Sequence, residues 1–208
     1  MSNVSIITDC IGNAGLEAAR KENKDVILVI TGNESGKLDE VKAALEAEGY
    51  EVHAFAADAS VKKEIHAVFA QANLLGKIKT VVHIPETLPE AADVETILRI
   101  NAVGTKNVNM EARKYMDEGG LIIDIASGDP SQVPDILVRH KTYEKAEYEE
   151  DAFMKQMVRE AKMAIGDKKE SAFANDLSSS FIEWYAGRCA EEYAAQGIKV
   201  VFRVEQLH

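Results

Sequence analysis

The sequence has few cysteines, few prolines and no long apolar run, and each shortage excludes a class of protein. Its two cysteines, Cys10 and Cys189, lie far apart and match no metal-ligand spacing. They indicate a reduced, cytoplasmic compartment, in which each cysteine is a small buried apolar residue rather than half of a disulfide. No apolar run approaches the ~20 residues of a membrane span, and the N-terminus has no basic region followed by an apolar stretch. We therefore expect a soluble chain.

Basic residues are also scarce relative to acidic ones. The sequence has 24 Lys and Arg against 35 Asp and Glu, a net charge of -11 and a pI of about 5.0. Because such a chain repels phosphate backbones and anionic headgroups, neither nucleic acid nor a membrane surface is an expected partner. Its 208 residues, 46% of them hydrophobic, suit a single domain over 1–208 with a sizeable core.

Short runs rich in valine and isoleucine alternate with amphipathic stretches. The six runs fall at 4–8, 25–31, 51–57, 79–84, 120–126 and 198–204. The helix-like stretches fall at about 13–23, 35–48, 60–75, 91–117 and 174–196. Continuous apolar runs of this length are typical of strands that are buried on both faces. The alternation predicts an α/β fold, a doubly wound parallel sheet of about six strands, Rossmann-like, with helices on both faces.

The alternation breaks once, between the fifth strand and the last helix. Residues 128–172 form an insertion that begins with the loop-like "GDPSQVPD" and continues through a charged stretch with a helical pattern. In a doubly wound sheet the ligand lies beyond the carboxyl ends of the strands. We expect the insertion over those ends, where it is either a lid or a helical decoration.

The first strand runs into "TDCIGNAGLEAAR", where a helix begins. A dinucleotide fold places G-x-G-x-x-G at this turn, so that the backbone can approach a pyrophosphate at the helix N-terminus. In that register the three positions are Cys10, Gly12 and Gly15, and Asn13 tolerates unusual backbone angles. Asp9 puts a carboxylate beside the expected diphosphate, which is unfavourable. The turn therefore indicates either a cofactor contact through Gly12, Asn13 and Gly15 or a tight turn without a ligand.

Five further motifs follow in order. They are "AADAS" after the third strand, "VVHIPE" at the end of the fourth, "RINAVGTKNV" in the next helix, "GGLIIDIAS" through the fifth strand and "CAEEYAAQGIKV" entering the sixth. With the glycine turn, they make the chain resemble the short-chain dehydrogenases/reductases over nearly its whole length. The resemblance implies Asp58 against the adenine, Asn101 as the functional asparagine and Ser127 as the catalytic serine. Pro85 and Glu86 replace the alanine and glycine of the family's N-N-A-G turn.

The helix that carries catalysis in this family departs most from the pattern. The family's tyrosine acid/base and the lysine one turn later fall at Asn175 and Ser179, counted back from Gly197. Neither side chain can donate and recover a proton near neutral pH in this role. We interpret both as catalytic positions that have changed and that packing does not need, in a helix retained for its fold. The sequence also stops at His208, before the substrate loop and seventh strand that the resemblance implies.

Two functions are compatible with this pattern. The preferred one is a degenerate short-chain dehydrogenase/reductase with little or no dehydrogenase activity, acting as a binding or oligomeric module. The alternative is an active NAD(P)-dependent oxidoreductase on a small alcohol or carbonyl compound, using Ser127 and Asn101 with a proton donor from residues 140–155. Loss of general acid/base catalysis alone costs about 10²–10⁴-fold in rate, which favours the first function.

The expected cofactor is NAD or NADP bound weakly, or none. Glu34 lies beyond the tip of the second strand, too far along for the acid that holds the ribose of NAD, and no arginine stands ready for a 2′-phosphate. His83 ends the fourth strand and is a candidate cofactor contact. Because no His, Cys or acid stands at ligand spacing from it, we expect a buried, hydrogen-bonded histidine and no metal.

The last helix also predicts a partner. Phe181, Trp184 and Tyr185 give it a broad apolar surface with a period near 3.6. In the family this helix and helix four form a four-helix dimer interface, and the last strand, "IKVVFRV", would leave an apolar edge that proteins normally cover or pair. We predict a homo-oligomer through helices 91–117 and 174–196, or pairing with a related full-length subunit that completes the sheet.

Overall fold

The computed structural model describes residues 2–85, 92–138, 140–163 and 170–205. The strands are β1 (Asn3–Ile7), β2 (Ile27–Gly32), β3 (Glu51–Ala56), β4 (Lys77–His83), β5 (Leu121–Ala126) and β6 (Lys199–Val204). The helices of four or more residues in the α conformation are α1 (Asn13–Lys21), α2 (Ser35–Ala47), α3 (Lys62–Leu75), α4 (Val94–Leu98), α5 (Gly104–Tyr115), α6 (His140–Tyr143), α7 (Glu150–Ala161) and α8 (Glu170–Tyr193). Within the described ranges, no helix combines the length and the apolar character that crossing a bilayer requires.

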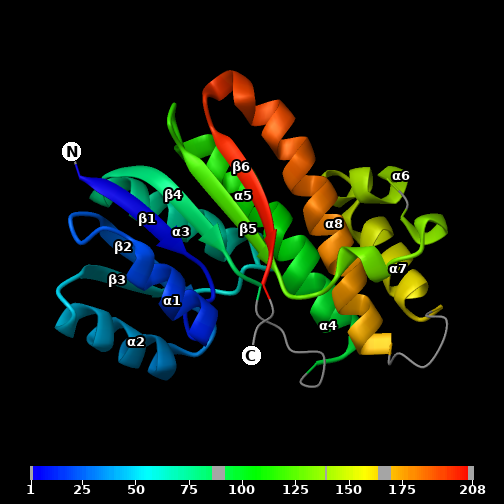
Figure 1. The fold of residues 1–208 in the computed structure, drawn as a ribbon, viewed down its shortest axis with the longest axis horizontal. Coiled ribbons are helices and arrows are strands. Elements are labelled where there is room, and N and C mark those ends of the chain that lie inside the picture. Colours follow the sequence, from blue (N-terminus) through cyan, green and yellow to red (C-terminus); the bar gives the residue numbers. More distant parts are fainter. Residues whose placement is uncertain (1, 86–91, 139, 164–169, 206–208) are drawn as a thin grey trace.

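The strands form one parallel sheet in the order β3-β2-β1-β4-β5-β6, with helices on both faces (Figure 1). The predicted doubly wound fold is thereby confirmed. β1 lies in the middle and pairs with β2 on one side and β4 on the other. The strand order reverses between these two neighbours, and ligands of such sheets bind in the crevice that opens there, at the carboxyl ends of the strands.

The core lies on both faces of the sheet, which explains the continuous apolar runs. In β2 every residue is buried. Ile27 and Val29 face the core that contains α3, α5 and α8, whereas Leu28 and Ile30 face the core on the side of α1 and α2. Because successive strand side chains point to opposite faces, a strand covered on both sides needs apolar residues at every position.

Both cysteines are buried, as predicted, and neither forms a disulfide. Cys10 belongs to the core on the side of α1 and α2. Cys189, a residue of α8, belongs to the core on the side of α3, α5 and α8. Burial raises the pKa of each thiol to about 12. Since the thiolate is the reactive form, both residues are packing groups.

The helical part of the insertion lies beside α8. It comprises η2 (Pro130–Gln132), η3 (Asp135–Leu137), α6, η4 (Glu144–Glu147) and α7. α7 packs against α4 and α8, and Figure 1 shows α6 and α7 on the side of α8 that faces away from the strands. The structure gives the helical part of this segment the place of a second helical layer on α8. The predicted position over the carboxyl ends of the strands, as a lid or as a helical decoration, stays a prediction.

Aromatic side chains join this layer to α8. The ring of Tyr143 meets the ring of Phe181 edge to face at 5.4 Å, and Phe153 lies 4.9 Å from Phe181 between ring centroids. The Tyr143 ring also lies 5.5 Å from the Trp184 ring. Aromatic pairs of this kind stabilise by about 0.5–1.5 kcal/mol each beyond their area burial. The apolar surface that the sequence displayed on the last helix is therefore covered by the chain's own insertion.

A pair of polar residues, His83 and Asp124, lies buried on neighbouring strands. They are register partners in β4 and β5, so their side chains leave the same face of the sheet. Both reach α5, where the imidazole of His83 contacts Thr105 at 3.1 Å and the carboxyl of Asp124 accepts hydrogen bonds from the side-chain amide of Asn109 at 2.9 and 3.0 Å. Desolvation lowers the pKa of His83 to about 3 and raises the pKa of Asp124 to about 7. These bonds fix α5 against the sheet, one helical turn apart.

Asp124 should make the free energy of unfolding fall as the pH rises. Its native pKa, about 7, exceeds the ordinary value of 3.8, so between these values the native state keeps a proton that the unfolded chain releases. The loss is at most about 1.4 kcal/mol for each pH unit in that window. Asp124→Asn removes this loss. The free energy of unfolding of the variant minus that of wild type, measured by urea unfolding, should therefore increase with pH. Asp39→Asn, on the exposed face of α2, is the control. A variant-to-wild-type difference that is constant with pH would contradict the expectation.

Candidate functional site

The turn between β1 and α1 is built around Asp9 and Gly15. Asp9 has a φ of 53°, in the left-handed region. The amide of Cys10 donates to the carbonyl of Thr31 at 2.7 Å, which fixes the turn to the tip of β2. A Cβ on Gly15 would lie 2.6 Å from the Cα of Cys10, so only glycine fits there. The residue in a glycine-like conformation is thus Asp9, whereas the predicted register placed Cys10 at the first glycine.

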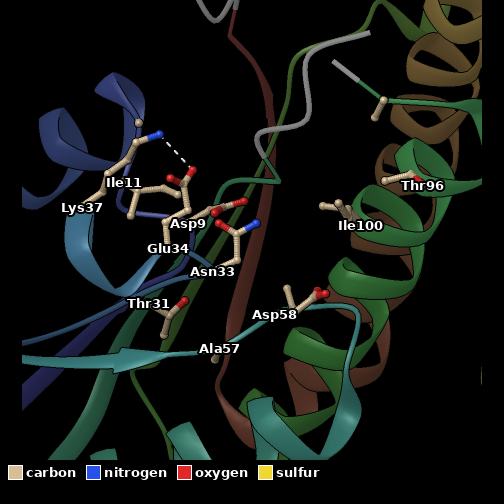
Figure 2. Close-up of a pocket in the computed structure, with 13 residues that line it drawn as sticks. Asp9, Ile11, Thr31, Asn33, Glu34, Lys37, Ala57, Asp58, Thr96 and Ile100 are labelled. Carbon is tan, nitrogen blue, oxygen red and sulfur yellow. Dashed lines mark hydrogen bonds and ion pairs between the residues drawn. The ribbon is translucent and has the colours of Figure 1, made fainter. Parts of the chain in front are cut away.

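A cavity of about 500 Å³ opens beside this turn (Figure 2). It lies between the β1–α1 turn, the ends of β2 and β3, and α4 with the turn that follows it. The residues that line it are Asp9, Ile11, Gly12, Thr31, Asn33, Glu34, Lys37, Ala57, Asp58, Ala59, Ala92, Thr96 and Ile100. Volumes of 300–1,000 Å³ are typical of sites for small molecules. The cavity is where the topology of the sheet predicts a ligand.

Of the five predicted cofactor-contact residues, two line this cavity and three do not. Gly12 and Asp58 line it. Asn13 is exposed as the first residue of α1, and Gly15 is buried behind the turn. His83 is fully buried in the hydrogen-bonded layer between the sheet and α5, as its sequence context predicted, so its side chain is not exposed for a cofactor to contact.

Carboxylates dominate the polar lining of the cavity. Asp9, Glu34 and Asp58 each contribute a carboxyl group, and Lys37 contributes an ammonium group. The Lys37 ammonium donates to a Glu34 carboxylate oxygen at 2.9 Å (Figure 2). The sequence placed Glu34 too far along, but the bend after β2 brings it back to the cavity. Lys37 was not among the predicted site residues, although its position three residues after Glu34 indicated an ion pair between the two side chains.

Three of the predicted catalytic residues meet in a buried network. The side-chain amide of Asn101 donates to the Asn175 carbonyl oxygen at 3.1 Å and to the Ser178 hydroxyl at 3.0 Å. The Ser127 hydroxyl lies 3.2 Å from the same Asn175 oxygen. Asn101 and Asn175 are 2% and 7% exposed. The structure therefore brings Asn101, Ser127 and Asn175 together, with the Asn101 and Asn175 amide nitrogens and the Ser127 hydroxyl directed within the network, while the Asn101 side-chain oxygen has no partner among the described residues.

Ser179 faces away from that network, toward the loop after β5. Its hydroxyl accepts a hydrogen bond from the Gly128 amide at 3.1 Å and donates to the Asn175 main-chain carbonyl at 2.9 Å. A Cβ on Gly128 would lie 2.6 Å from that carbonyl oxygen and 2.7 Å from the Ser179 hydroxyl. The interpretation that packing does not need positions 175 and 179 is wrong, because α8 makes its close approach to the loop there.

Asn101 lies in a π-helical turn, η1 (Arg99–Val103), which separates α4 from α5. The Thr105 hydroxyl donates to the Asn101 carbonyl at 2.6 Å, so it accepts a hydrogen bond from the His83 Nε2–H. The Nδ1 of His83 then accepts from the Thr8 hydroxyl at 2.8 Å. These bonds require the neutral imidazole, in agreement with its lowered pKa. The predicted single helix 91–117 is thus interrupted at the residue that carries the site asparagine.

The close contact at Gly128 gives a stability test with a matched control. Gly128→Ala should lower the free energy of unfolding by about 1–3 kcal/mol, because its Cβ overlaps the backbone of α8. Gly187 lies within α8, and a Cβ added there meets no atom within 4 Å. Gly187→Ala should therefore raise the free energy of unfolding by up to about 1 kcal/mol. Urea unfolding followed by circular dichroism measures both. Equal effects of the two changes would show that α8 does not rest on Gly128.

Comparison with known proteins identifies the fold. No family model and no curated protein matches the sequence. A double variant of a short-chain dehydrogenase/reductase from Serratia marcescens matches with a TM-score of 0.71 and 17% identity, over 96% of this chain and 72% of that one. An actinorhodin polyketide ketoreductase variant with NADPH gives 0.69 and 18%, over 97% and 69%. A Burkholderia cenocepacia short-chain dehydrogenase with NADP gives 0.66 and 19%, over 95% and 71%. The chain has the fold of the short-chain dehydrogenases/reductases.

Proposed function

We propose that this chain is a binding domain on the short-chain dehydrogenase/reductase fold that holds a nucleoside- or nucleotide-type ligand without transferring hydride. The observation that carries the proposal is the hydrogen-bonded network of Asn101, Ser127 and Asn175, in which both asparagines are buried and the serine is half-buried. The groups at these positions bond to one another, where a working site needs them directed at a substrate. The cavity at the ends of β2 and β3 supports the binding part of the proposal.

Hydride transfer to or from a carbonyl needs a group that donates and recovers a proton. Asn175 is a neutral amide whose oxygen accepts from Asn101 and whose side-chain nitrogen lies 3.2 Å from the Ser127 hydroxyl. Ser179 bonds backbone groups on both sides of the α8–loop contact. Neither residue has an acid/base group that titrates near neutral pH, so loss of general acid/base catalysis is the expected consequence.

Residues 140–155, all of which the structure describes, hold their candidate proton donors away from Asn101 and Asn175. The Tyr143 hydroxyl bonds to Ser180 at 3.3 Å, and burial raises its pKa to about 12. His140 stacks on Trp184, on the outer side of α8. Tyr148 is 66% exposed, and Lys155 lies with α4 residues at a separate hollow. These contacts hold the candidate donors of residues 140–155 on the far side of α8 or at the surface.

The residues present favour one end of a nicotinamide dinucleotide over the whole molecule. The cavity leaves room for one end of such a molecule, beside Gly12 and Asp58. At the other end, where the resemblance would put the nicotinamide, Asn101 and Asn175 fill the space between η1 and α8 with bonds to each other. The similar structures that carry NADPH or NADP make a nucleotide the natural class to test.

We expect binding without turnover. Calorimetric titration with NAD, NADH, NADP, NADPH and adenosine should detect a ligand, while nicotinamide absorbance with a panel of small alcohols and aldehydes should show no hydride transfer. The double variant Asn175→Tyr plus Ser179→Lys should stay inactive and lose stability, because the lysine ammonium would be buried against Gly128. Hydride transfer by the wild type would overturn the proposal in favour of an active oxidoreductase. Absence of binding by every compound would remove its binding part.

The homo-oligomer and the full-length partner stay predictions. One of their two grounds has weakened, because the aromatic face of α8 packs against α6 and α7 of the same chain. The other ground is the edge strand β6, where Arg203 and Val204 are exposed. Sedimentation equilibrium of the purified chain tests both.

A further inference from the structure

The cavity beside β2 and β3 has two kinds of wall. Apolar side chains of Ile11 and Ile100 and the alanines Ala57, Ala59 and Ala92 provide a surface without hydrogen-bonding groups. Thr31, Asn33, Glu34 and Asp58 provide donors and acceptors at the strand ends. In Figure 2 the side chains of Asp9, Asn33 and Glu34 gather on one side of the opening, and Thr96 and Ile100 stand on the other. An aromatic base suits the apolar surface, and carboxylates are good acceptors for sugar hydroxyls.

The charge of the lining is unfavourable for phosphate. Three carboxylates face one ammonium group, which makes the lining net negative by two charges. The ammonium group of Lys37 is engaged with Glu34 at 2.9 Å. Phosphate sites need cationic side chains or backbone amides that no other anion occupies. This lining offers one cation, already shared with a carboxylate, so a phosphate would enter against the local field.

Asp9 holds its carboxylate at the place where the fold otherwise favours an anion. The Cys10–Thr31 backbone bond and the close packing of Gly15 anchor the main chain of the turn, so the Cα of Asp9 stays beside the start of α1. The N-terminus of α1, at Gly12, begins directly beyond it. Helix N-termini attract negative groups. A carboxylate fixed beside this one repels a ligand anion and attracts a neutral or cationic substituent.

We propose that this cavity takes a nucleoside whose sugar carries no phosphate, with a neutral or cationic 5′ substituent. The inference rests on the proposed binding function and names the ligand class of the same site. The base lies against the apolar wall, the sugar hydroxyls donate to the carboxylates of Glu34 and Asp58, and the 5′ position faces Asp9. The fold's dinucleotide cofactor is thereby excluded by charge at its diphosphate as well as by packing at α8.

Four ligands that share the base and the sugar hydroxyls test the proposal by calorimetry with the full chain. They are 5′-amino-5′-deoxyadenosine, adenosine, AMP and NAD. Adenosine should bind at least about tenfold more tightly than AMP or NAD, and the cationic amine should bind at least as tightly as adenosine. The preference for adenosine over AMP should shrink as salt rises, since the repulsion is partly screened.

Variants assign the preference to named charges. Asp9→Asn should reduce the ratio of AMP to adenosine dissociation constants several-fold, and Glu34→Gln should do the same by releasing Lys37. Asp39→Asn, on the exposed face of α2, is the matched control and should leave the ratio unchanged. If AMP or NAD binds wild type as tightly as adenosine, or if Asp9→Asn leaves the ratio unchanged, this inference is wrong while the proposed binding function stands. If none of the four ligands binds, this inference is wrong, and if NADH, NADP and NADPH also fail to bind, the binding part of the proposed function is wrong as well.

Discussion

The contact between α8 and the loop after β5 constrains the rest of the site. At Gly128 the backbone of the loop comes so close to α8 that a single added carbon would overlap the Asn175 carbonyl. Hydrogen bonds from the Gly128 amide to Ser179 and from the Asp129 amide to the Asp176 carboxylate tie the two elements together. This approach requires glycine at 128, and the Ser179 hydroxyl and the Asn175 carbonyl lie against it. The Asn175 side-chain amide lies on Asn101 and Ser127.

The carboxyl edge of the sheet is consequently divided. On the side of β5, side chains from η1, the loop and α8 hydrogen-bond to one another in a polar seam, and within the described residues only the Asn101 side-chain oxygen of this seam is left without a partner. On the side of β2 and β3, the elements stand apart and enclose a cavity whose polar lining is mainly carboxylate. Room for a ligand and the groups that would react with it therefore lie at different places along one edge. This separation is the physical basis for proposing binding without hydride transfer.

The insertion completes the molecule on the outer side of α8. Its aromatic rings cover a helix face that would otherwise expose Phe181 and Tyr185, and the Tyr185 hydroxyl donates to the Glu147 carboxylate at 2.8 Å. Lys106 of α5 is buried beside Glu150 at the start of α7, with 2.5 Å between their charged atoms. These contacts give the added segment a packing role. They also show that an apolar helix face in a sequence does not identify its partner, which for α8 is an earlier part of the same chain.

The sequence by itself determined the fold and the position of most elements. Apolar runs such as "DVILVIT" specify a strand covered on both faces, and the alternation of six such runs with amphipathic stretches leaves few topologies. The resemblance of its motifs to the short-chain dehydrogenases/reductases also placed Asn101, Ser127 and Asn175 in one constellation. These features depend on local periodicity and on short motifs, which a sequence displays directly.

Only the tertiary structure decided what those residues touch. That Ser179 bonds the Gly128 amide, that Asp9 rather than Cys10 adopts the left-handed backbone, and that Glu34 returns to the cavity depend on distances between segments far apart in the chain. The burial of Asp124 beside His83 likewise follows from the register of β4 and β5. Hydrogen-bond direction, cavity shape and pKa shifts arise from packing in three dimensions, so no pattern of residue types could supply them.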